Sequence, residues 1–380
     1  MVNKDHTCDD LRIADFHKNA WSESQLIQSV RFCFIYIITW MSIYGRPRKT
    51  ANITRPIYVE AHLRFWRCAT QGVRILFMNR FIEMVSFAAL LSLFTVSSPC
   101  ISDEQPTKLA DVHLHWKWNQ KEVTEPEQAI NILRDNNVRL AVVTGTPPEL
   151  ALELQQLAPD IVIPIYGIYQ DRIDWSNWYR DNELVGRVRQ ALESGNYRGI
   201  GELHMISGFI SDWKHPNISG LFELAAVFDV PVLVHTEFSR ADYLIGFCSA
   251  HPKTRFLWAH AGSVLPPDEV ARALRDCANL NVELSARDPW RHVGRPIIDE
   301  TGVLKAEWRD LVITYANRFM IGSDPVWPVE QLNPWDEPDT GWQQLSRFLG
   351  FHREWLKQLP TEVAQKVLYI NAVDYFKWQH

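Results

Sequence analysis

The strongest constraint on the fold is an alternation of short apolar runs with amphipathic stretches, which occurs eight times after residue 107. Apolar runs of this length, bounded by turn residues, are typical of buried strands. The predicted strands are residues 109–115, 139–145, 161–168, 199–204, 231–236, 255–260, 281–285 and 319–323. Helical patterns separate them. The first, residues 125–136, begins beside Thr124 and Pro126, which suit a helix start, and the tail from 341 to 377 is helical too.

Strands that are each followed by a helix imply a parallel sheet. Eight such units within residues 107–380 match the usual size of a closed barrel. The sequence therefore predicts an α/β fold, a (β/α)8 TIM barrel with an N-terminal extension. An open, doubly wound sheet is the alternative, and the strand count alone does not exclude it. The Gly-rich turn that a dinucleotide fold places after its first strand is missing from this sequence, which favours the barrel.

The first 106 residues differ from the rest. Residues 1–77 mix basic and aromatic residues without a sustained period, and we assign them no function. Residues 78–106 resemble a signal peptide and linker: Met78 and Arg80 precede an apolar stretch at 84–96, and Ser97, Ser98 and Ser102 follow it. We therefore expect a periplasmic or secreted protein. The alternatives are an uncleaved segment that anchors the chain in a membrane, and a buried helix in a cytoplasmic protein.

Composition limits the partners. The net charge is −6 and no long Lys/Arg run is present, so a nucleic-acid partner is not expected, whereas a small-molecule substrate is. Oligomeric state stays open. Six cysteines at 8, 33, 68, 100, 248 and 277 include no C-x-x-C pair and indicate no disulfide framework. Cys248 and Cys277 are interpreted as inert thiols on the apolar faces of helices.

Ionisable residues occur where the predicted strands end, which is where a barrel of this kind carries its active site. They are Asp111, His113, His115, Glu202, His204, His235, Glu237, His260 and Asp324. His113 and His115 are two apart on one strand, so both can face the barrel axis and bind one ion. Imidazole nitrogens and carboxylates are ligands that zinc accepts. A single histidine here would suggest only a hydrogen-bonded ring, but convergence from several strands favours a metal centre.

The residues from about 108 to 378 resemble the amidohydrolase superfamily, and especially its amidohydrolase-related branch. The resemblance is carried by D-V-H-L-H at 111–115, V-H-T-E at 234–237, W-A-H-A-G at 258–262 and I-G-S-D-P at 321–325. It implies that His113, His115, His235 and Asp324 are metal-binding or catalytic, and that His260 is either a ligand or a group that polarises the substrate. Glu202 stands where many members carry a carboxylated lysine, and it is similar to the bridging glutamate of the TatD-like branch. The resemblance thus implies a divalent metal, expected to be zinc, as one ion or two.

The resemblance also implies a reaction. A bound ion would lower the pKa of its water to roughly 7, and Asp324 would act as general base, with the cleavage of a C–O or C–N bond in a lactone, ester or amide. One alternative is a non-oxidative decarboxylase of an aromatic or unsaturated carboxylic acid, which uses one divalent metal. Another is a barrel that binds metal without catalysis.

Loops after the strands are expected to bind the substrate, because they are rich in aromatic residues. The candidates are His204, Arg287, Trp116 and Trp290, with Trp118, Tyr169, Trp175, Trp178 and Trp327 nearby in the sequence. Arg287 could grip a substrate carboxylate, or it could be a surface residue that pairs with Asp288. His204 shares a strand face with Glu202 and could bind substrate, a water, or nothing.

Overall fold

The computed structural model describes residues 107–170, 174, 177–291, 295–326 and 337–379. The predictions for residues 1–106, and those for Trp175 and Trp327, lie outside the described residues. In the part of the chain that the structure describes, no helix is both long and apolar enough to cross a membrane.

Eight parallel strands occur within the described residues, in the order that the sequence predicts. Strands β1 to β3 pair in sequence order, and so do β4 to β8. Their bounds are β1 Leu109–Lys117, β2 Val138–Thr146, β3 Val162–Ile165, β4 Ile200–His204, β5 Pro231–His235, β6 Arg255–Trp258, β7 Leu280–Glu283 and β8 Phe319–Met320.

Backbone hydrogen bonds join these two sets of strands into one barrel. Between β3 and β4, the Tyr166 amide donates to the Gly199 carbonyl at 2.8 Å. Between β8 and β1, the Val112 amide donates to the Ile321 carbonyl at 3.1 Å. Together with the parallel pairing, these bonds show the (β/α)8 fold, and they exclude the open sheet.

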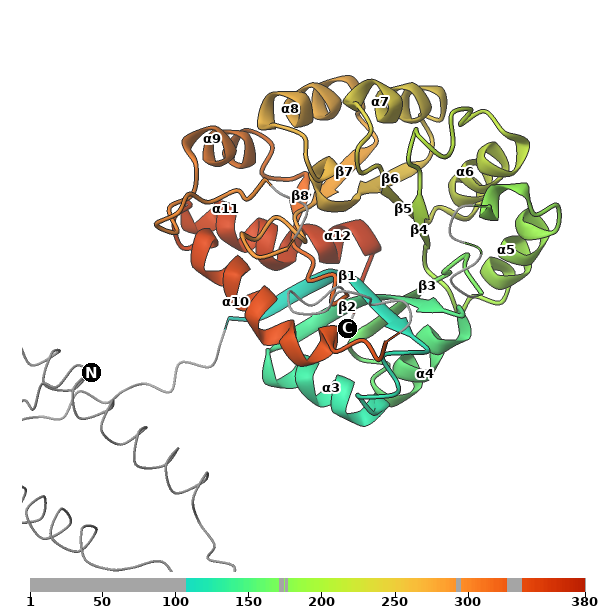
Figure 1. The fold of residues 1–380 in the computed structure, drawn as a ribbon, viewed down its shortest axis with the longest axis horizontal. Helices are drawn as coiled ribbons and strands as arrows, with labels where there is room; N and C mark the ends of the chain where they lie inside the picture. The colour runs from blue at the N-terminus through green and yellow to red at the C-terminus, as the bar shows by residue number, and fades with distance from the viewer. Residues whose placement is uncertain (1–106, 171–173, 175–176, 292–294, 327–336, 380) are drawn as a thin grey trace, which may run out of the picture. The chain divides into compact units, whose positions relative to one another are not determined.

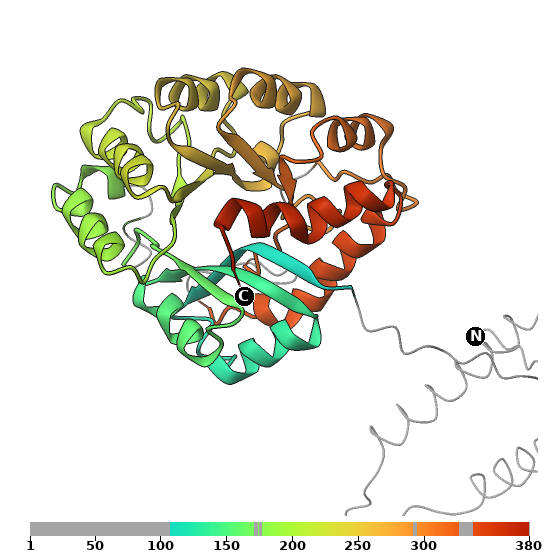
Figure 2. The same ribbon diagram turned by 180° about the vertical axis from the view of Figure 1, so that it is seen from behind.

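Helices surround the strands, as Figures 1 and 2 show. Several begin where proline or a capping pair predicts a start: in α3 the backbone and side chains of Glu125 and Gln128 form a capping box. The helices that follow the strands are α3 Pro126–Asp135, α4 Glu149–Leu157, α5 Leu184–Glu193, α6 Pro216–Phe228, α7 Ala241–Ala250, α8 Pro267–Asp276 and α9 Ala306–Thr314. The C-terminal segment forms α10 Leu345–Leu356, α11 Thr361–Gln365, the π-helical turn η7 Lys366–Ile370 and α12 Asn371–Phe376. Short 3-10 turns occur at η4 Trp178–Arg180, η5 Ala259–Gly262 and η6 Gly341–Gln344.

Away from the strand ends that carry the polar residues, the interior of the barrel is filled by an apolar layer. Val112, Leu233, Leu257 and Met320 are buried there, and Phe376 of α12 packs against them. The register of β1 shifts between Asp111 and Leu114. Such a bulge changes the alternation of side chains, so that Val112 joins the apolar layer while His113 and His115 also face inward above it.

Cys248 and Cys277 form a disulfide, so the prediction of two separate buried thiols was wrong. Cys248 lies in α7, Cys277 follows the last residue of α8, and their Cα atoms are 6.1 Å apart. Both side chains are buried. The pairing had no local sequence signal, because the two residues are 29 positions apart and meet only when the two helices pack side by side.

Candidate metal centre

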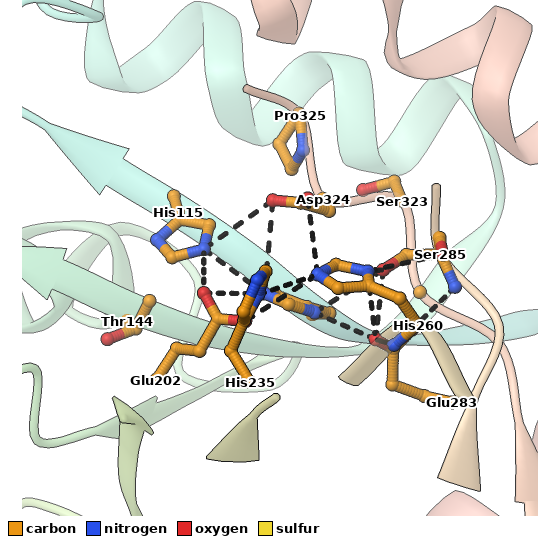
Figure 3. Close-up of polar contacts among 12 residues, drawn as sticks. His115, Thr144, Glu202, His235, His260, Glu283, Ser285, Ser323, Asp324 and Pro325 are labelled. Atoms are coloured by element: carbon orange, nitrogen blue, oxygen red, sulfur yellow. Dashed lines mark hydrogen bonds and ion pairs between the residues drawn. The ribbon is translucent and has the colours of Figure 1, made fainter. Parts of the chain in front are cut away.

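The strand ends bring six predicted site residues together at one end of the barrel. Figure 3 shows the side chains of His115, Glu202, His235, His260 and Asp324 turned toward a common centre, although they come from five different strand ends. His113, from β1, lies within 4 Å of this group through its Nε2 atom. All of them are buried or nearly buried.

One half of the centre is formed by His113, His115 and Asp324. The Nε2 atoms of His113 and His115 are 3.1 Å apart, and they lie 3.8 and 3.5 Å from Asp324 Oδ1. Glu202 Oε2 completes this half, at 3.5 Å from His113 Nε2 and 3.3 Å from His115 Nε2.

The other half is formed by His235 and His260 around the second oxygen of Glu202. Glu202 Oε1 is 3.0 Å from His235 Nδ1 and 3.6 Å from His260 Nε2, and these two nitrogens are 3.2 Å apart. Asp324 Oδ2 reaches toward this half, at 3.9 Å from His260 Nε2. Each oxygen of Glu202 therefore faces a different pair of imidazoles.

This donor set fits divalent metal ions. Histidine nitrogens and carboxylate oxygens are hard to borderline ligands, and they converge here in buried groups that include His113, His115 and Asp324, and Glu202, His235 and His260. Ring nitrogens that face each other at 3.1 and 3.2 Å would bring two lone pairs together without a cation or a proton between them. Among the described residues, the buried Asp324 Oδ1 atom has no hydrogen-bond donor.

The charges of the site are strongly coupled. Burial opposes a charge on His113, but Glu202, Asp324 and Glu283 outweigh it and raise the pKa of His113 well above its ordinary value. Burial likewise opposes a charge on His235, whereas Glu202 and Glu237 raise its pKa to about 9. The pKa of Glu202 is lowered well below its ordinary value because His113 and His235 outweigh its burial. Without an ion, the site is thus poised to hold protons that a divalent cation would replace.

Two of the strand ends depart from extended geometry. The prediction extended the sixth strand to His260, but β6 ends at Trp258 and the chain turns through η5, where His260 and Ala261 have φ angles of 57° and 49°. Asp324, after β8, has a φ angle of 47°. Left-handed conformations are costly for residues other than glycine, and they concentrate at functional sites. Here they turn the side chains of His260 and Asp324 into the barrel.

The structure places Arg287 neither at the metal centre as a clamp for a substrate carboxylate nor on the surface beside Asp288. It is only 1% exposed, and its guanidinium donates to four backbone carbonyls, three of which follow β6. The bonds are Nε to His260 O at 2.7 Å, Nη2 to Ala261 O at 2.8 Å and to Leu265 O at 3.1 Å, and Nη1 to Arg295 O at 3.1 Å. Asp288 pairs with Arg291 instead, at 2.7 Å. Arg287 is therefore neither a substrate clamp nor a surface residue, because all three of its nitrogens are bonded to backbone.

Of the two tryptophans predicted to bind substrate, Trp116 does not point into the centre, and contact of Trp290 with a substrate stays a prediction. Trp116 is fully buried on the outer face of β1, where its Nε1 donates to Glu153 at 3.1 Å and its ring packs on Trp342. The alternation of side chains along a strand explains the error, since the neighbour of an inward His115 points outward. Trp290 is half-buried, and its ring packs against Phe351 and under the Arg347 guanidinium.

His204 is beside the centre. Its Nε2 atom is 3.8 Å from Glu202 Oε2, and its Nδ1 atom is 2.7 Å from the Tyr169 hydroxyl. Burial lowers the pKa of His204 well below its ordinary value, which favours a neutral ring. Its contact with a substrate stays a prediction.

Glu283 was missed. It ends β7, its side chain is fully buried, and its Oε1 atom is 2.9 Å from His113 Nδ1. His113, with smaller contributions from His260 and Ser285, outweighs the effect of burial and lowers the pKa of Glu283 to about 2. The signal was present: Glu283 is an acid inside the apolar run of the predicted strand at 281–285.

A family model described as amidohydrolase matches residues 181–378, which is more than half of the chain. The chain belongs to the amidohydrolase family. It is accordingly an enzyme of the metal-dependent hydrolase type, and the resemblance seen in the sequence is confirmed. The match begins before β4 and so includes the strand ends that carry Glu202, His235, His260 and Asp324.

Solved structures with the same fold include a TatD homologue from Escherichia coli K12, with 13% identity over 71% of this chain and 98% of that chain and a TM-score of 0.50. A zinc-bound amidohydrolase from Burkholderia multivorans is 15% identical over 72% of this chain and 100% of that chain, with a TM-score of 0.48. A probable 2-pyrone-4,6-dicarboxylic acid hydrolase from Acinetobacter baumannii is 13% identical over 72% and 100%, with a TM-score of 0.46. At these identities the likeness to the TatD homologue concerns the fold alone. Among curated proteins, no sequence matches this chain significantly.

Proposed function

We propose that this amidohydrolase uses divalent metal, expected to be zinc, to hydrolyse a C–O or C–N bond in a small lactone, ester or amide. The ligands would be His113, His115, Glu202, His235, His260 and Asp324. The observation that carries the proposal is that the two oxygens of Glu202 face different pairs of histidines. Its Oε2 atom faces His113 and His115, while its Oε1 atom faces His235 and His260.

The same observation supports two ions rather than one. Glu202 offers one oxygen to each of two groups of imidazoles, so this one carboxylate could help to hold an ion in each group. Asp324 lies between the two groups, with Oδ1 near His113 and His115 and Oδ2 toward His260.

Bound ions would activate a water molecule and polarise the oxygen of the scissile group. Asp324 would then take the proton at a carboxylate oxygen and deliver it to the leaving group, which is the work of a general base and acid. Asp324 would use one carboxylate oxygen as a ligand and the other for this proton transfer, and its Oδ1 atom is buried and accepts no hydrogen bond from the described residues. The apolar layer that includes Val112, Leu233 and Leu257 would exclude water from the barrel interior beneath the metal centre.

The proposal is tested on the zinc-loaded protein with a panel of lactones, esters and amides, by following proton release for the lactones and esters and the liberated amine for the amides. At least one class should be turned over, and chelation of the metal should stop the reaction. Asp324→Asn should lower kcat by about 10²- to 10⁴-fold, because the general base is lost. Asp310→Asn, an exposed change on α9, is the matched control and should leave kcat unchanged.

Two results would contradict this proposal. Release of carbon dioxide from benzoate-type acids, with no turnover of the hydrolysis panel, would replace hydrolysis with decarboxylation. Full activity of Asp324→Asn would remove Asp324 from the reaction.

We also propose that the protein works outside the cytoplasm. The disulfide between Cys248 and Cys277 supports this location, because disulfides persist in oxidising compartments. The signal-like sequence at 78–106 supports it independently. Fractionation of cells, with the N-terminal sequence of the mature chain, tests the proposal, and an intact N-terminus in the cytoplasmic fraction would contradict it.

A further inference from the structure

Glu283 accepts hydrogen bonds at both of its oxygens. Oε1 accepts from the backbone amide of His260 at 2.7 Å and from the Ser285 hydroxyl at 2.9 Å. Oε2 accepts from the backbone amide of Ser285 at 2.7 Å. Because backbone amides can only donate, this arrangement suits an ionised carboxylate, which accepts and does not donate.

His113 is oriented by this carboxylate. Its Nδ1 atom is 2.9 Å from Glu283 Oε1, so Nδ1 carries the hydrogen and donates it. In the neutral ring, the other nitrogen then keeps its lone pair. That nitrogen, Nε2, is the atom that faces His115, Glu202 and Asp324.

His260 is oriented through Ser285. The Ser285 hydroxyl gives its hydrogen to Glu283, so the hydroxyl oxygen accepts from His260 Nδ1 at 2.8 Å. The Ser285 carbonyl lies 3.2 Å from the same Nδ1 atom, and a carbonyl can only accept. Nδ1 of His260 therefore also carries the hydrogen, and its Nε2 lone pair faces Glu202. Figure 3 shows the dashed contacts that join His260, Ser285 and Glu283.

We propose that Glu283 is a positioning residue that fixes both His113 and His260 with their Nε2 lone pairs toward the metal ions. This inference rests on the proposed metal centre. Glu283 also lies with His113 and His260 in a group that could hold a metal, but its Oε1 atom already accepts from His113 Nδ1, the Ser285 hydroxyl and the His260 amide, which favours the positioning role. A carboxylate that holds a metal-bound histidine by its other nitrogen is a recurring way to orient such ligands, and here one carboxylate serves two histidines on different strand ends.

Gly322 provides the room that this arrangement needs. A Cβ atom at position 322 would lie 2.6 Å from Glu283 Oε2 and 2.7 Å from His113 Cβ. Both distances are far inside ordinary van der Waals contact, and neither group can move without losing the contacts just described. The backbone after β8 thus approaches closely enough to hold Glu283 and His113 against each other.

The experiment compares zinc affinity, measured by competition with a chromophoric chelator, in the wild type and in Glu283→Gln. The side-chain amide is nearly the same size, but it must present NH₂ either to His113 or to a backbone amide. We expect zinc affinity to fall by about 10- to 100-fold, as for other changes of this kind. Asp339→Asn is the matched control: Asp339 is equally buried but pairs with Lys117 at 2.7 Å, so zinc affinity should stay within about twofold of the wild type on the same scale.

Long-range ¹H–¹⁵N spectra of the zinc-loaded protein supply a readout that altered stability alone would not move. In the wild type, Nδ1 of His113 and of His260 should carry the hydrogen and Nε2 should bind zinc. Ser285→Ala should change the signals of His260 more than those of His113, because Ser285 Oγ lies 2.8 Å from His260 Nδ1 and 3.4 Å from His113 Nδ1. This variant also tests the proposal if Glu283→Gln fails to fold. Gly322→Ala should reproduce the loss of zinc affinity although Glu283 is retained.

The outcomes separate this inference from the one on which it rests. If the wild type binds no zinc, the proposed metal centre fails. If the wild type binds zinc, and Glu283→Gln and Ser285→Ala bind it equally well with unchanged imidazole signals, only the positioning role of Glu283 is overturned.

Discussion

At the scale of single residues, the sequence identified the residues that meet and missed the one that holds them. His113, Glu202, His235, His260 and Asp324 could be found because each interrupts or closes an apolar run, and parallel strands end at the same edge. Their functional roles stay predictions. Arg287 could not be placed from the sequence, because its partners are backbone carbonyls of a turn that no local pattern announced. A buried arginine near a site resembles a substrate clamp until its hydrogen bonds are known.

His352 gives a residue-scale prediction outside the metal centre. It is buried, its Nε2–H donates to the Gly322 carbonyl at 2.9 Å, and its Nδ1 accepts from Trp355 at 3.1 Å. Burial lowers the pKa of His352 to about 4 from 6.5. Because the unfolded chain binds this proton more tightly, the stability that neutral His352 contributes is full above pH 6.5 and is lost as pH falls toward 4.

The measurement is the free energy of unfolding by urea at pH 7.5 and pH 5. Between these two pH values the wild type should lose about 2 kcal/mol more than His352→Gln, which cannot titrate. Equal losses in the two proteins would show that His352 is not the responsible group.

At the scale of elements, each predicted strand overlaps an observed one, but the residues at which the strands end differ from the prediction. Apolar periodicity marks where a strand is buried, but it does not show where the backbone leaves the extended conformation. The sixth strand illustrates this, because W-A-H-A-G continues an apolar run while His260 and Ala261 already have left-handed φ angles. Long-range hydrogen bonds from Arg287 to His260 O and Ala261 O accompany that turn, and sequence periodicity carries no information about them.

Arg287→Lys tests this element. A lysine cannot reproduce the forked set of donors, so several buried carbonyls would lose their partners, at a cost of about 3 kcal/mol in the free energy of unfolding. Arg309→Lys, on the exposed surface of α9, is the matched control and should change stability by less than about 0.5 kcal/mol. Similar stability of the two variants, measured by urea denaturation, would contradict the role of Arg287 in the turn.

The disulfide between α7 and α8 gives a second prediction for the elements. It closes a loop of 29 residues, for which the loss of unfolded-state entropy corresponds to a stabilisation of about 2 to 4 kcal/mol. The double variant Cys248→Ala/Cys277→Ala should unfold at correspondingly lower urea concentration, and reductant should shift the wild type but not the variant. Two titratable thiols in the oxidised, denatured wild type, beyond those of the other cysteines, would show that the bond does not form.

At the scale of the whole molecule, the count of strands and helices predicted the barrel, and the bonds that close it came only from the structure. The hydrogen bonds that close the barrel join Tyr166 to Gly199 and Val112 to Ile321. Val112 and Ile321 are far apart in the sequence. Closure is what brings β1 beside β8, and so His113 and His115 beside Asp324. It also aligns the Glu202 carboxylate between two pairs of histidines, which no single motif could show.

We propose that this closed barrel holds divalent metal at the ends of its strands. The most direct test is the metal content of the purified chain, measured by elemental analysis, in the wild type and in His113→Ala/His115→Ala. We expect about two ions per wild-type chain and loss of bound metal in the double variant, with the barrel still folded by circular dichroism. A double variant that keeps the full metal content of the wild type would contradict it.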